Sequence, residues 1–171
     1  MKGDEGLKKI IYIVLSLSVL LLVGCNSPKT MEEAFHKEMK SLKDVDDYTL
    51  VKQIEKDNVI LFTSYIEGDE ENNEQLNIVH FNKVNNEWFW DKTASCNDKW
   101  SGKLGDKPYI WCGTLTEPRH DIVYVGDTKA NVIEVEGGIE RVWYHLSEND
   151  NEEIKVVLAD GSEEWLKEVI K

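Results

Sequence analysis

The residue types that most often carry chemistry are few in this chain, and their spacing does not match the common reactive sites. Its three cysteines and four histidines contain no C-x-x-C, H-x-H or H-E-x-x-H spacing. Those spacings converge ligands on one zinc ion or place two thiols in a redox pair. The sequence therefore predicts neither a metal site nor a bound cofactor.

Catalytic side chains are equally hard to identify. No serine lies in the G-x-S-x-G or S-x-x-K context of an activated nucleophile. The 33 Asp and Glu residues could form a hydrolytic pair in many ways, so their abundance points to no particular residue. The sequence predicts no catalytic residue, and a hydrolase would have to use carboxylates that the pattern does not single out.

Aromatic residues form the densest group with binding potential. Trp88, Trp90, Trp100 and Trp111 lie within 24 positions, and Trp88 and Trp90 flank Phe89. In a strand, Trp88 and Trp90 would share one face. Two interpretations stay open: an exposed recognition surface for a sugar or peptide, or core packing on both faces.

The N-terminus indicates where the protein works. Lys8 and Lys9 precede an apolar run, 10–23, that ends in Leu22-Val23-Gly24-Cys25. Fourteen residues are short for a membrane span, which needs roughly 20, and fit the apolar core of a signal peptide. A plain N-terminal anchor helix with an incidental cysteine is the alternative.

The segment Leu22-Val23-Gly24-Cys25 resembles the lipobox of bacterial lipoproteins. The resemblance implies a diacylglycerol on the Cys25 thiol, cleavage after Gly24, and anchoring in the bilayer on the extracytoplasmic face of the cell membrane. Two acyl chains hold a protein stably where one does so marginally. The stretch from Cys112-Gly113-Thr114-Leu115 to Asp160-Gly161 is similar to uncharacterised small lipoproteins of Bacillus-type bacteria, a likeness that carries over no catalytic residue.

Cys96 and Cys112 are then the two cysteines left in an exported chain, where disulfides persist. Antiparallel neighbours bring Cα atoms to about 5.5 Å, which a disulfide accepts. We expect these two residues to form a disulfide. The alternative is two reduced, buried thiols.

The remaining pattern predicts a mainly β fold. Thr30 and Glu33 predict a helix start, with the helix ending near Ser41 or Lys43. The segment 48–55 fits a helix slightly better than a strand. The predicted strands are 59–66, 76–84, 87–93, 109–115, 122–125, 132–135, 139–146 and 154–158, with hairpin turns at Asn85-Asn86 and Gly137-Gly138 and a polar loop at 97–108. Residues 164–170 close the chain.

Short strands with frequent turns predict an antiparallel sandwich or barrel-like domain. We divide the chain into a signal peptide (1–24), a lipidated cysteine and linker (25–30), and a single β-rich domain with an N-terminal helix (31–171). The five or six linker residues would span about 20 Å, which keeps the domain close to the membrane.

The net charge limits the classes of partner that the chain can bind. Without residues 1–24 the chain keeps 17 basic and 31 acidic residues, a net charge of −14. Such a chain repels nucleic acid, whose binding requires Lys and Arg against phosphates. We expect a non-catalytic binding or interaction module that contacts an envelope protein or cell-wall component. The alternative is a cell-envelope hydrolase using unidentified carboxylates.

Overall fold

The computed structural model describes residues 27–42, 45–66, 74–97, 100–103, 106–135 and 141–166. The elements are α2 (Met31–Met39), β1 (Val45–Ile54), the 3₁₀ turn η1 (Glu55–Asp57), β2 (Val59–Ile66), β3 (Gln75–Val84), β4 (Glu87–Ser95), β5 (Ser101–Lys103), β6 (Tyr109–Leu115), β7 (His120–Val125), β8 (Thr128–Lys129), β9 (Asn131–Glu134), β10 (Arg141–Ser147), β11 (Ile154–Leu158) and β12 (Glu163–Trp165).

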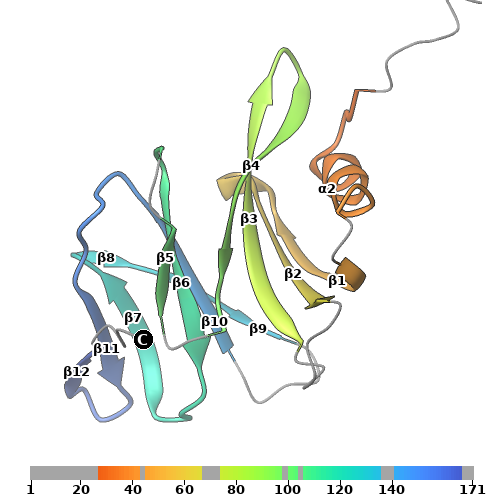
Figure 1. Cartoon of the computed structure of the whole chain (residues 1–171). Coiled ribbons are helices and arrows are strands. Elements are labelled where there is room, and N and C mark those ends of the chain that lie inside the picture. The colour runs from red at the N-terminus through yellow and green to blue at the C-terminus, as the bar shows by residue number, and fades with distance from the viewer. Residues whose placement is uncertain are drawn as a thin grey trace, which may run out of the picture.

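These strands form three antiparallel sheets of four strands each. Sheet A has the order β1-β2-β3-β4, sheet B the order β5-β6-β10-β9, and sheet C the order β12-β11-β7-β8. Helix α2 covers one face of sheet A, sheet B lies on its other side, and sheet C follows beyond sheet B (Figure 1). The structure confirms the predicted mainly antiparallel β class with a short N-terminal helix.

Three apolar cores separate the four layers, and strand alternation explains them. In β2, Val59 and Leu61 enter the core between sheets A and B, while Ile60 and Phe62 enter the core beneath α2. Successive strand side chains point to opposite faces, so an inner strand such as β2 must be apolar on both faces. This explains the unbroken apolar run at the start of β2.

Helix α2 begins where the sequence predicts. The Thr30 side chain accepts a hydrogen bond from the Glu33 backbone N–H at 3.1 Å, and the Glu33 carboxylate accepts one from the Thr30 backbone N–H. This reciprocal pair is a capping box. It fixes the register that turns Met31, Ala34, Phe35 and Met39 onto sheet A.

The hairpin between β3 and β4 is also confirmed. Asn85 and Asn86 adopt φ values of 52° and 66°, in the left-handed region that asparagine tolerates better than most residues. Strands 59–66 and 109–115 keep their predicted bounds as β2 and β6. The predicted turn at Gly137-Gly138 lies outside the described residues.

The preference for a helix over 48–55 is wrong, because β1 occupies this stretch. A bulge between Leu50 and Lys52 is the physical reason. Tyr48 and Leu50 face α2 and Val51 faces sheet B, as alternation requires, but the extra residue then places Ile54 on the sheet B side as well. A bulge breaks strict alternation, and the resulting apolar spacing imitates a helical one.

The predicted loop over 97–108 contains a strand, β5, which pairs with β6. Its central residue, Gly102, has no side chain because a Cβ would lie 2.9 Å from Cζ3 of Trp111. The Trp111 ring covers the glycine, an arrangement that stabilises glycine within sheets. A strand of three residues centred on glycine gives no periodic signal.

Candidate functional site

A groove of about 540 Å³ opens between the C-terminal end of α2 and sheet A. Its volume lies in the range of small-molecule sites. The residues that line it come from α2, the segment after it, and all four strands of sheet A: Glu38, Met39, Leu42, Val45, Phe62, Ser64, Gln75, Asn77, Phe89, Trp90 and Thr93.

Trp90 is the aromatic residue of the groove that its neighbours hold most firmly. Its ring lies parallel to that of Phe35 at a centroid distance of 6.0 Å, and edge-on to Phe62 and Phe81 at 6.0 and 5.6 Å. Aromatic pairs in such geometries fix one another. The groove therefore presents a rigid aromatic side chain instead of one that must be ordered by a ligand.

The polar part of the groove is mainly uncharged. Asn77 Nδ2 donates to Ser64 Oγ at 3.2 Å and to the Gln75 carbonyl at 3.1 Å. Ser64 and Gln75 face each other across β2 and β3, so the strand register places these amide and hydroxyl groups. Glu38 is the one charged side chain among the described lining residues.

The structure divides the four tryptophans that sequence analysis singled out into two pairs. Trp88 and Trp90 pack against the core beneath α2. Trp100 and Trp111 lie between sheets B and C, with ring centroids 5.8 Å apart. The four residues do not form one surface, and Trp90 alone among them lines the groove.

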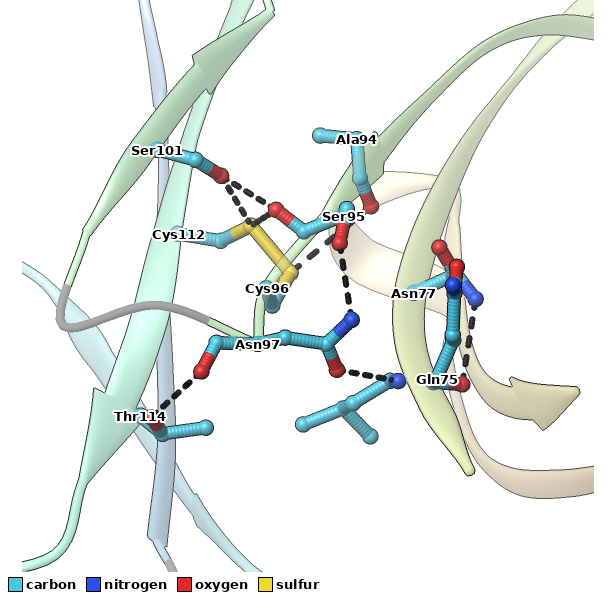
Figure 2. The surroundings of a disulfide bond; sticks show 10 residues. Gln75, Asn77, Ala94, Ser95, Cys96, Asn97, Ser101, Cys112 and Thr114 are labelled. Atoms are coloured by element: carbon cyan, nitrogen blue, oxygen red, sulfur yellow. Dashed lines mark hydrogen bonds between the residues drawn. A yellow bond between two sulfur atoms is a disulfide. The ribbon is translucent and has the colours of Figure 1, made fainter. Parts of the chain in front are cut away.

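Cys96 and Cys112 lie at disulfide distance, with sulfur atoms 2.14 Å and Cα atoms 5.3 Å apart. Both are fully buried in the core between sheets A and B. Cys96 follows the edge strand β4, whereas Cys112 lies within β6 (Figure 2). The pair therefore joins two facing sheets and not, as the sequence argument assumed, two adjacent strands of one sheet.

Asn97 reinforces the same junction. Its Oδ1 accepts from the Leu76 backbone N–H at 2.6 Å, and its carbonyl accepts from Thr114 Oγ1 at 3.3 Å (Figure 2). One residue thus contacts β3 of sheet A and β6 of sheet B. The Cys96–Cys112 pair and the hydrogen bonds of Asn97 thus hold the end of β4 together.

A histidine–aspartate pair that joins the middle of β3 to β4 was not predicted. His80 Nδ1 lies 2.9 Å from Asp91 Oδ2, and Lys92 Nζ lies 3.4 Å from the same oxygen. Asp91 is the extra residue of a bulge opposite His80 and Phe81, so sequence spacing could not bring it to His80. The pair does not line the groove.

Asp57, in η1, accepts a hydrogen bond from Tyr144 Oη at 2.6 Å and one from Asn131 Nδ2 at 3.5 Å, which couples sheet A to sheet B. Burial, reinforced by Asp57, raises the pKa of Tyr144. Burial also lowers the pKa of His145, with Glu152 and Asp57 opposing that shift. Neither residue lines the groove, so these shifts reflect packing between sheets.

Cys25 and the signal-peptide residues lie outside the described residues. In the part of the chain that the structure describes, no helix has the length and apolar content to cross a bilayer. Over the same residues, no three His, Cys, Asp or Glu side chains are placed to hold a metal ion.

Comparison of the chain with protein-family models, with curated proteins and with solved structures finds no match.

Proposed function

We propose that this protein is a lipid-anchored, extracytoplasmic binding module that holds its ligand in the groove between α2 and sheet A. The observation that carries the proposal is the composition of that groove: a fixed tryptophan, further apolar side chains, and a rim of amide and hydroxyl groups. Ligand sites combine an apolar lining with a few placed polar groups in this way.

The anchor and the groove would lie at opposite ends of α2. The predicted acylation site, Cys25, precedes the start of the helix, whereas Glu38, Met39 and Leu42 line the groove at its end. Nine helical residues separate the two ends by about 13 Å. A domain anchored at the first end directs the groove away from the bilayer, toward the cell wall.

The lining favours an uncharged ligand with an apolar face. Glu38 repels anions, and no lysine or arginine lines the groove among the described residues. A sugar ring offers C–H groups to the face of Trp90 and hydroxyl groups to Gln75 and Asn77. We therefore assign the groove to a neutral, N-acetylated segment of cell-wall glycan.

Binding is favoured over hydrolysis for the same site. Glycosidases place two carboxyl groups about 5–9.5 Å apart across the scissile bond. Among the described residues of the groove, Glu38 is the sole carboxylate. The cell-envelope hydrolase of the sequence analysis would have to use another part of the chain.

Calorimetric titration with neutral N-acetylated glycan fragments tests the proposal. Leu42 is 47% exposed, so Leu42→Asp should leave the fold intact while placing a charge in the groove. We expect it to weaken binding at least about tenfold, or ~1.4 kcal/mol.

The matched control is Val132→Asp, at a 36% exposed position on β9 that does not line the groove. It should bind like the unmodified protein. Equal affinities of the two variants would exclude the groove, and binding of an envelope protein but no glycan would replace the ligand assignment.

We also propose that Cys96 and Cys112 are oxidised in the exported protein. Full burial of both residues and their Cα separation of 5.3 Å support this state, because that separation lies within the range of native disulfides.

A further inference from the structure

The segment predicted to be a linker is held against the body of the protein. The Trp88 backbone N–H donates to the Pro28 carbonyl at 3.2 Å, and Pro28 is buried. Pro28 therefore lies against the start of β4, shortly before α2 begins. This part of the linker does not act as a free spacer.

The contact sets the direction in which the chain leaves the domain. Residues 27–30 and the tip of the β3–β4 hairpin project at the same end of the molecule (Figure 1). The tip carries the turn Asn85-Asn86, and Lys83 faces Trp88 across the two strands. An anchor attached to the chain just before residue 27 would therefore lie near this hairpin.

The hairpin tip exposes an apolar side chain, Val84, which is 52% exposed. Next to it, Lys83 places its Nζ 5.0 Å from the centre of the Trp88 ring. Aromatic residues and long basic side chains are the groups that settle at the membrane–water interface.

We propose that the tip of the β3–β4 hairpin rests in the headgroup layer of the bilayer, beside the lipid anchor. This inference rests on the proposed acylation of Cys25. Cys25 and Pro28 are three positions apart, so at most about 10 Å of extended chain joins the acyl chains to the Trp88 contact.

The hairpin is long enough to cover this distance. Beyond Trp88 the chain continues toward the tip through Glu87, the first residue of β4, and the turn residue Asn86. Two residues extend the tip by about 7 Å, and the headgroup layer on each side of a bilayer is about 5–7 Å thick. The short tether and the protruding hairpin thus end at the same depth. A tether this short leaves no space for a protein partner between the hairpin tip and the bilayer.

Charge restricts the contact to the tip. The chain without its signal peptide carries a net charge of −14, which opposes the approach of its acidic surface to anionic lipid. At the hairpin end, Lys29 and Lys83 offset the charges of Glu33 and Glu87, so this end can approach the membrane without a large excess of negative charge. The hairpin would fix the orientation of the domain, and the acyl chains its membrane affinity.

The test uses the full lipidated protein in vesicles of phosphatidylcholine and phosphatidylglycerol. A single cysteine at Val84→Cys carries an environment-sensitive fluorophore, and Val132→Cys, also an exposed valine, is the matched control. We expect the label at residue 84 to shift to shorter wavelength, to lose iodide accessibility and to be quenched by brominated lipid. The label at residue 132 should keep the properties that it has in water.

Flotation of the same samples separates this inference from the proposed anchor. If the protein floats with vesicles and both labels stay equally accessible to iodide, the hairpin contact is refuted and the anchor is retained. If the protein does not float, the proposed acylation fails, and the hairpin contact fails with it.

Discussion

At the scale of single residues, the position that most clearly requires glycine is Gly126, in the turn between β7 and β8. Its φ is +56°, and a Cβ would lie 2.5 Å from Glu152 Oε2. The Glu152 carboxylate cannot move freely, because Oε1 accepts from Ser147 Oγ at 2.5 Å and from Asn149 Nδ2 at 3.2 Å. The segment between β10 and β11, which carries Glu152, is therefore held in place by its own hydrogen bonds.

We expect Gly126→Ala to destabilise the protein by about 1–3 kcal/mol, from the left-handed backbone and the displaced carboxylate. Gly161→Ala is the matched control, since Gly161 has φ of +84° but no atom within 4 Å of its Cβ position. Urea unfolding of both variants measures the difference. Equal losses would mean that Glu152 yields without cost.

Residue patterns predicted some positions well and others not at all. The Thr30 cap, the Asn85-Asn86 turn and the Cys96–Cys112 pair depend on residues close in sequence or few in number, so they could be predicted. The groove could not, because it joins Glu38 to Thr93 through packing of α2 on sheet A. Periodicity shows that a face is buried but does not say which face covers it.

At the scale of elements, the same limit separates β2 from β1. The β2 sequence is apolar on both faces and matches its prediction, while the bulge in β1 moved Ile54 out of alternation, onto the same face as Val51. The tryptophans follow the same logic: sequence proximity grouped four residues that the layers separate into two cores. Neither a bulge nor a change of layer can be recognised from the local spacing of residues.

Among the contacts between elements, the Cys96–Cys112 pair has the largest expected effect on the free energy of unfolding. Closing the 16-residue separation should contribute about 3 kcal/mol in the chain-entropy model, and here it ties sheet A to sheet B. We expect a reducing agent to lower the free energy of unfolding by about that amount in the unmodified protein. A Cys96→Ala, Cys112→Ala variant should no longer respond to the reductant.

Alkylation followed by mass spectrometry checks the redox state directly. Two thiols that react after unfolding without prior reduction would show that the protein keeps both cysteines reduced. The response to reductant would then have no structural cause at this site.

At the scale of the whole molecule, folding and location are assigned to different parts of the chain. The three cores between the layers use residues from Met31 to Leu166, and the predicted acylation site lies before them. We expect Cys25→Ala to abolish lipid labelling and to move the protein from the membrane to the aqueous fraction. Its melting temperature should match that of the delipidated protein, because no core residue changes.

Cys112→Ala serves as the matched cysteine control for this experiment. It removes a buried residue of the core between sheets A and B, so it should lower the melting temperature while leaving lipid labelling unchanged. If anchoring and folding are separate, Cys25→Ala changes lipid labelling but not the melting temperature, and Cys112→Ala changes the melting temperature but not lipid labelling. A Cys25→Ala protein that still fractionates with membranes, beside an unmodified protein that never takes up labelled lipid, would show that another feature holds the molecule at the bilayer.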